Sequence, residues 1–123
     1  MGQSFKDLIV WQKAIALTLA IYKLTESFPP SERYGLTDQL RRAAVSIASN
    51  IAEGYGRSTR GEYLQFLGYA RGSNCEIEAQ LVIVAALGLA TESNRATAER
   101  LCADVSRLLR GLMLKLRSNP SGS

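Results

Sequence analysis

Runs of apolar residues with helical spacing account for most of this chain. In residues 92–117, apolar side chains recur at steps of three and four: Ala98, Leu101, Val105, Leu108, Leu109, Leu112 and Leu116. That spacing puts them on one face of an α-helix and does not match the alternation of a half-buried strand. Earlier runs show the same kind of pattern, so the sequence predicts four long helices and no sheet.

Helix-ending residues divide the first half of the chain into two helices. We expect the first over residues 6–27 and the second over residues 31–52. Phe28-Pro29-Pro30 ends the first, because proline lacks an amide hydrogen and clashes with the preceding turn. Ser31 is the expected N-cap of the second helix. Gly54 and Gly56 are expected to end it, because glycine can adopt the left-handed conformation there.

The second half of the chain divides in the same way. We expect a third helix over residues 59–87 and a fourth over residues 92–117. Thr59 and Glu62 have the spacing of a capping box, and Gly88 directly follows the third apolar run. Thr91 or Ser93 is the expected N-cap of the fourth helix.

Helices of this length with short links predict an all-α fold, an antiparallel up-down-up-down four-helix bundle. A chain of 123 residues is long enough for one domain with a real core. We expect that domain over residues 1–117 and a disordered tail over residues 118–123. The first helix is apolar nearly all round, which suggests burial against a partner subunit as well as within the bundle.

The absence of histidine narrows the possible chemistry. It excludes Ser-His-Asp and Cys-His catalysis, His-based metal sites and the Glu-x-x-His signature of di-metal bundles. We therefore expect no enzymatic activity and no cofactor. The enzymatic alternative is a carboxylate site built from Glu53, Glu76 and Glu78, because glycosidase-like chemistry needs convergent carboxylates.

The hydrophobic pattern also bears on location. No apolar run reaches the roughly 18 residues that a membrane span needs, and no leader peptide is recognisable. Cys75 and Cys102 sit among apolar residues and are expected to be reduced thiols that serve packing. We expect a cytoplasmic protein with no membrane partner.

The positive charge is concentrated toward the C-terminal end. The net charge is +4, and residues 91–123 hold six basic and three acidic residues. Basic stripes bind nucleic acid by releasing counterions from phosphates. The candidate nucleic-acid contacts are Arg57, Arg60, Arg100, Arg107, Arg110, Lys115 and Arg117. The alternative is a solvated helix face, because Glu92, Glu99 and Asp104 dilute the basic residues.

Polar residues on the second and third helices form a candidate structural network. Its members are Arg41, Arg42, Asn50, Glu53, Arg71, Asn74 and Glu78. Buried polar groups need hydrogen-bonding partners, and such networks often set register or assembly. We therefore expect Glu78, beside the core face, to pair with one of the three arginines in this set. The alternative is a polar functional site at the mouth of a pocket or ring.

Small residues line the side of the third helix opposite its core face. They are Gly68, Gly72, Cys75, Ala79 and Ala86. Glycine inside a helix costs about 1 kcal/mol relative to alanine, so two glycines four residues apart indicate a close helix contact. We predict a subunit interface at Gly68, Gly72 and Ala79. The alternative is a close contact within the bundle.

Five motifs carry a family resemblance. They are Leu8-x-x-Trp11-x-x-Ala14, Phe28-Pro29-x-x-Glu32, Gln39-Leu40-x-Arg42-Ala43, Ser46-Ile47-x-x-Asn50-Ile51-Ala52-Glu53-Gly54 and Gly72-Ser73-x-x-Glu76-x-Glu78. Over about residues 5–89 the chain resembles the four-helix bundle family also called the 23S ribosomal RNA intervening-sequence proteins. The resemblance extends to the accessory protein of diversity-generating retroelements, which works with a reverse transcriptase and is implicated in nucleic-acid binding.

The resemblance implies a bacterial, cytoplasmic, ring-like homopentamer. Combined with the residues, it gives a main hypothesis of a non-enzymatic homo-oligomeric interaction module that binds RNA or DNA through basic surface. The second hypothesis is a structural or protein-interaction module that binds another protein and no nucleic acid.

Overall fold

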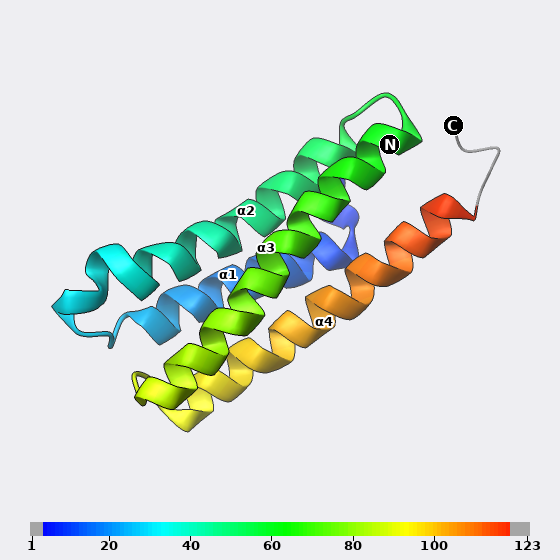
Figure 1. The fold of residues 1–123 in the computed structure, drawn as a ribbon. Coiled ribbons are helices and arrows are strands. Elements are labelled where there is room, and N and C mark those ends of the chain that lie inside the picture. The colour runs from blue at the N-terminus through cyan, green and yellow to red at the C-terminus, as the bar shows by residue number, and fades with distance from the viewer. Residues whose placement is uncertain (1–3, 119–123) are drawn as a thin grey trace.

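Four long helices form the chain's framework (Figure 1). The structure is a computed structural model that describes residues 4–118. The helices are α1 (Ile9–Thr25), α2 (Asp38–Tyr55), α3 (Arg60–Leu87) and α4 (Glu92–Arg117). Those residues contain no strand, so the predicted all-α class is confirmed.

The helices pack side by side as a bundle. Helix α2 packs most extensively against α3, α1 packs against α4, and α1–α2 and α3–α4 contacts complete the arrangement. Helices α1 and α3 therefore lie on one diagonal, and α2 and α4 on the other. Each helix contributes fully buried aliphatic side chains to one core, for example Leu17, Ile47, Leu81 and Leu109.

The chain enters α1 through a separate turn, so the predicted start at residue 6 is wrong. Phe5–Asp7 forms a short 3₁₀ turn, and Leu8 is extended between that turn and α1. The Ser4 hydroxyl accepts a hydrogen bond from the Lys6 amide at 3.1 Å, and the Asp7 carboxylate accepts one from the Ser4 amide at 3.1 Å. This cap stabilises the start of the turn, and the extended Leu8 separates the turn from α1 where the sequence pattern predicted continuous helix.

The connection from α1 to α2 is more irregular than predicted. Pro30–Glu32 is a 3₁₀ turn and Arg33–Thr37 is a π-type turn, in which Gly35 leaves helical geometry at φ −107° and ψ −114°. The Glu32 carboxylate, not Ser31, accepts a hydrogen bond from a backbone amide, that of Leu36 at 3.3 Å. The predicted start of the second helix at Ser31 is therefore wrong, and α2 begins at Asp38.

Gly54 has a different role from the predicted helix end. Helix α2 continues through it to Tyr55, and the following Gly56 has φ −83° and so does not adopt the left-handed conformation. Gly54 is buried, and a Cβ there would lie 2.9 Å from the Cβ of Phe66 and 3.2 Å from the backbone oxygen of Tyr63. The glycine therefore allows the start of α3 to approach the end of α2.

The boundaries of the last two helices agree closely with the prediction. The Thr59 hydroxyl accepts a hydrogen bond from the Glu62 amide at 3.1 Å, and Gly88 ends α3 in the left-handed conformation at φ 65°. Thr91, rather than Ser93, caps α4 by accepting from the Asn94 amide at 3.1 Å.

The predicted disordered tail falls largely on residues 119–123, which lie outside the described part of the chain. Among residues 4–118, we find no helix with both the length and the apolar character that crossing a bilayer requires.

Candidate functional site

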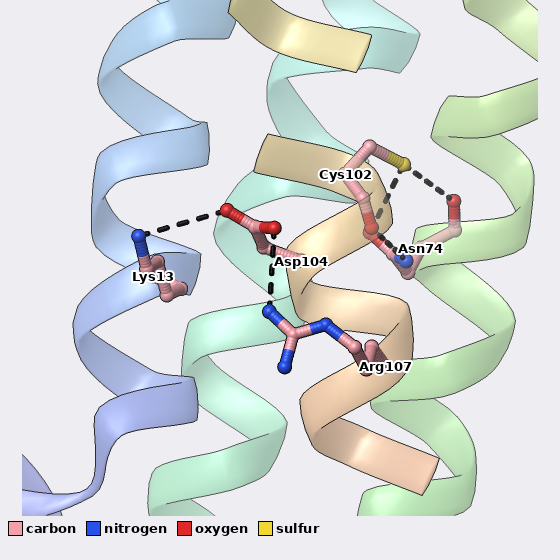
Figure 2. A network of polar contacts seen from close by, with 5 residues as sticks. All are labelled: Lys13, Asn74, Cys102, Asp104 and Arg107. Atoms are coloured by element: carbon pink, nitrogen blue, oxygen red, sulfur yellow. Dashed lines mark hydrogen bonds and ion pairs between the residues drawn. The ribbon is translucent and has the colours of Figure 1, made fainter. Parts of the chain in front are cut away.

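Four of the five arginines of α4, all but Arg95, and its one lysine lie on the exposed surface of the helix. Arg100, Arg107, Arg110, Lys115 and Arg117 are all exposed. Asp104 interrupts this basic surface: its Oδ1 lies 3.4 Å from Arg107 Nη2, and its Oδ2 lies 3.6 Å from Lys13 Nζ on α1 (Figure 2). Exposed ion pairs contribute little to stability, about 0.2–1 kcal/mol, but they reduce the charge open to a partner.

The remaining candidate contacts lie at the turn between α2 and α3. Arg57 is held there, because its Nη2 lies 2.7 Å from Glu53 Oε2 and its guanidinium lies 4.6 Å from the centre of the Phe66 ring. Arg60 is partly buried, and its Nη1 is a buried nitrogen with no hydrogen-bond partner in the described structure. Because neighbouring helices run antiparallel, this turn lies at the same end of the bundle as the C-terminal end of α4 (Figure 1).

The structure divides the predicted polar network into separate local contacts. Arg41 donates from Nε to the Thr25 hydroxyl at 2.8 Å, and its guanidinium lies 4.5 Å from the centre of the Tyr22 ring. Arg42 is exposed and lies 3.8 Å from Asp38. These contacts join α1 to α2 and support the start of α2; they do not converge on one site.

Asn50 bonds within α2 to Ser46, which makes a polar contact with α3. Its Nδ2 donates to the backbone oxygen of Ser46 at 2.9 Å and lies 3.0 Å from the Ser46 hydroxyl. The Ser46 and Ser73 hydroxyls are 2.9 Å apart and bridge the two helices. This arrangement fits the structural interpretation of Asn50.

The predicted ion pair of Glu78 is wrong for the chain described here. Glu78 and Arg71 are both exposed, and within residues 4–118 neither belongs to an ion pair. Glu78 instead borders an open groove between α3 and α4, beside Glu99 and Ala103. Its charge stays hydrated there, so it does not need a partner.

Asn74 is the buried member of the predicted network. Its Nδ2 donates to the backbone oxygen of Cys102 at 3.0 Å, and the Cys102 sulfur lies 3.3 Å from Asn74 Oδ1 (Figure 2). The two residues therefore join α3 to α4 at a fixed register. Their pairing depends on how two helices align, which the periodicity of either helix alone does not reveal.

The two thiols have different surroundings. Both are free, but only Cys102 is buried; the prediction that Cys75 packs inside is wrong. Burial raises the pKa of the Cys102 thiol to about 12, and the nearby Glu78 and Cys75 act in the same direction. The protonated form is a poor nucleophile, so this thiol is suited to packing rather than to catalysis.

A second polar contact between helices, which is partly buried, was not predicted. Gln80 is buried, and its Nε2 donates to Gln39 Oε1 at 3.2 Å across the α2–α3 interface. Its own Oε1 is buried without a hydrogen-bond partner in the described structure. The sequence did contain a signal for the burial of Gln80, because Gln80 lies three residues after Ile77 and four before Val84, on the core face of α3.

A strip of small and apolar residues runs along the exposed side of α3, and the exposed Arg71, Glu76 and Glu78 flank it. We define the α3 face as Gly68, Gly72, Cys75, Ala79, Val82, Ile83 and Ala86. A Cβ built at Gly68 or Gly72 meets nothing within 4 Å. No close helix contact within the bundle therefore requires these glycines, and that alternative is wrong for the single chain.

Aliphatic side chains at the far end of the α3 face are unusually open. Val82 is 67% exposed and Ile83 is 46% exposed, and Leu87 beside them is 57% exposed. Scattered exposed aliphatics are common, but a continuous apolar face marks an interaction surface.

Metal binding finds no support in the geometry. No group of three or more Cys, Asp or Glu side chains is placed to hold a metal ion within the described residues. The three carboxylates considered for catalysis are also dispersed: Glu53 pairs with Arg57, while Glu76 and Glu78 border different grooves.

The comparison with protein families agrees with the motifs. The model of the 23S rRNA-intervening sequence protein family matches residues 6–111, which is most of the chain. The chain belongs to this family. The match includes α1, α2, α3 and most of α4, and so covers both the α3 face and the first arginines of α4.

A solved structure supports the fold of this family member. A protein of unknown function from the S23 ribosomal protein family of Bacteroides thetaiotaomicron VPI-5482 is similar with a TM-score of 0.76. The two share 19% sequence identity, and the similarity covers 85% of this chain and 98% of that chain. No curated protein matches the chain significantly.

Proposed function

We propose that this chain is a non-enzymatic homo-oligomeric bundle, a pentamer, that acts as an interaction module. The observation that carries the proposal is the α3 face, an exposed apolar surface whose glycines have no packing role inside the bundle. A second copy that covers this face would remove Val82, Ile83 and Leu87 from water. Burial of apolar surface contributes roughly 25 cal/mol per Å² to the free energy of association, so it would stabilise such an assembly.

The proposal includes binding of RNA or DNA through the basic end of the bundle. Helix α4 ends there with Lys115 and Arg117, at the same end of the bundle as the turn that carries Arg57 and Arg60 (Figure 1). A ring would present this surface several times, and repeated weak contacts gain affinity through multivalency. A cytoplasmic location is part of the proposal and is supported by the two free thiols.

Charge-reversal variants test the nucleic-acid part. Arg110→Glu/Arg117→Glu changes the basic surface of α4, whereas Lys23→Glu/Arg33→Glu makes the same change in net charge at the opposite end of the bundle. All four positions are exposed, so both variants should fold. Binding to a fluorescent structured RNA and to double-stranded DNA would be measured as a function of salt.

The first variant should weaken binding and lower the slope of log K against log salt by about 1 for each phosphate that the variant no longer neutralises. The control variant should bind nearly as the unmodified chain does. Equal weakening in both variants would mean that net charge alone governs binding and would refute a defined basic surface.

A protein-interaction module without nucleic-acid binding is the second candidate function. The ion pairs of Arg57 with Glu53 and of Arg107 with Asp104 favour it, because internal carboxylates already engage part of the positive charge. An assembled chain that binds neither nucleic acid at low salt would support this candidate.

A further inference from the structure

The bundle has a second apolar surface, a groove between α1 and α2. We define the α1–α2 groove by Phe5, which precedes α1, by Trp11, Ile15 and Thr18 of α1, and by Val45, Ala48, Ser49 and Ala52 of α2. Its volume is about 320 Å³. An apolar cavity of about 150 Å³ can hold a benzene ring, so this groove has room for roughly two aliphatic side chains.

Little polar surface would be removed from water if the groove were covered. Among residues 4–118, none of those that line it is charged. The Thr18 hydroxyl is already engaged, since it donates to the Ala14 backbone oxygen at 2.8 Å and lies 3.3 Å from the Ala44 backbone oxygen. Ser49 also lines the groove and is exposed, so a covering partner would have to leave its hydroxyl in water or supply a hydrogen bond to it.

The α3 face carries both projecting apolar side chains and positions with little or no side chain. Val82 and Ile83 are the aliphatic side chains of that face that extend into solvent, at 67% and 46% exposure. Gly72 and Ala79 carry almost no side chain, so a neighbouring helix could approach the α3 backbone closely at those positions. A face with two projecting side chains and a smooth small-residue strip fits against a shallow apolar groove.

The two surfaces lie on different parts of the molecule and share no residue. Helix α3 packs between α2 and α4, whereas the groove involves α1, which lies diagonally across the bundle and behind α3 in Figure 1. A contact between unlike surfaces is heterologous, and its repetition closes a ring or extends a filament. A contact of two α3 faces would be isologous and would leave the groove open to water.

We propose that the α3 face of one chain binds in the α1–α2 groove of a second copy, with each chain using both surfaces. This inference rests on the proposed homo-oligomer and specifies its contact. Val82 and Ile83 fill the groove beside Trp11 and Val45, and the small side chains of the α3 face bring the helices close. The contact is complete only when both unlike surfaces are present.

Two single substitutions separate the surfaces. Ala79→Arg places a charge on the α3 face, and Val45→Arg places one at the groove. Ala96→Arg is the matched control, because Ala96 is an exposed alanine on α4 outside both surfaces. Circular dichroism and thermal melting confirm folding, and light scattering coupled to size exclusion gives the mass.

The inference predicts that each variant alone is a monomer of 13.4 kDa, while the control has the mass of the unmodified chain. Mixing the two variants should give a one-to-one heterodimer, since one keeps a working groove and the other a working α3 face. An assembled Val45→Arg chain, or a mixture that stays monomeric, would overturn the inference. A monomeric unmodified chain would instead overturn the proposed homo-oligomer.

Cross-linking decides the matter if the Val45→Arg chain does not fold. Cys75 lies exposed on the α3 face, and Val45→Cys adds a thiol at the groove with little change in volume. A short bifunctional maleimide should then link Val45→Cys chains into a ladder of multimers, whereas the unmodified chain should not cross-link. Dimers of the unmodified chain through Cys75 alone would show an isologous α3 contact and refute the inference.

Discussion

Replacing Gly54 with alanine tests the account of how α2 meets α3. The new Cβ would lie 2.9 Å from the Cβ of Phe66, 3.1 Å from a ring carbon of Tyr63 and 3.2 Å from the Tyr63 backbone oxygen. Two of these atoms belong to backbone or to the first side-chain position, so neither can rotate away. The start of α3 must shift for the methyl group to fit.

Two opposing effects set the size of the change. Alanine is favoured over glycine inside a helix by about 1 kcal/mol. Overpacking a close contact costs typically about 1–3 kcal/mol. We expect the steric cost to exceed the helix gain, because backbone must move, and Gly54→Ala should lower the free energy of unfolding by up to about 2 kcal/mol.

Gly111→Ala is the matched control. Gly111 lies within α4, is exposed, and has nothing within 4 Å of a built Cβ. At Gly111 no steric cost opposes the preference for alanine over glycine in a helix. The substitution should therefore raise the free energy of unfolding by roughly 0.5–1 kcal/mol. The same change of residue is thus expected to have opposite signs at two helical positions.

Thermal melting at one fixed protein concentration would measure both. For a domain of this size, 1 kcal/mol corresponds to a shift of roughly 3–6 °C in Tm. Gly54→Ala should melt several degrees below the unmodified chain and Gly111→Ala a few degrees above it. If Gly54→Ala were as stable as Gly111→Ala, the reasoning about the close approach of α3 would be refuted.

Two further predictions concern the buried contact between α3 and α4. Asn74→Ala should lower the free energy of unfolding by about 1–3 kcal/mol in urea titration, because it removes the side-chain donor to the Cys102 backbone oxygen and the nearer acceptor of the Cys102 thiol, which keeps only the backbone oxygen of residue 74 at 3.6 Å; an unchanged midpoint would show that this contact contributes nothing. Because the pKa of Cys102 is raised in the folded chain, the unfolded chain loses the thiol proton at a lower pH than the folded chain does. The contribution of the thiol to stability is therefore fully present below about pH 9 and falls as pH rises toward about 12. Relative to Cys102→Ser, the unmodified chain should therefore lose stability by up to about 1.4 kcal/mol per pH unit in that window, and parallel pH profiles for the two chains would contradict the assignment.

The sequence predicted α3 and α4 well because their signals are local. A threonine cap, a long apolar periodicity and a terminal glycine each act within a few residues, and Thr59, Gly88 and Thr91 do what their positions predict. The link before α2 could not be predicted in the same way. Its geometry depends on Gly35 leaving helical conformation and on the Glu32 carboxylate capping Leu36, which together override the preference of Ser31 for an N-cap.

The candidate site shows the same division between local and tertiary information. Periodicity placed Glu78 beside the core face of α3, but whether the next helix covers that edge depends on how α3 and α4 pack. They leave a groove there, so Glu78 stays exposed. One turn away, Asn74 is buried and meets Cys102, a contact that depends on the alignment of two helices. The glycines of the α3 face were recognised from sequence, but only the structure shows that nothing inside the bundle needs them.

The most direct test of the central claim is the mass of the unmodified chain in solution. Light scattering coupled to size exclusion, over a range of protein concentrations, reports it without labels or partners. The account predicts a mass near five times the 13.4 kDa of one chain. A stable monomer at all concentrations would contradict it, because the α3 face and the α1–α2 groove would then be shown to remain open to water.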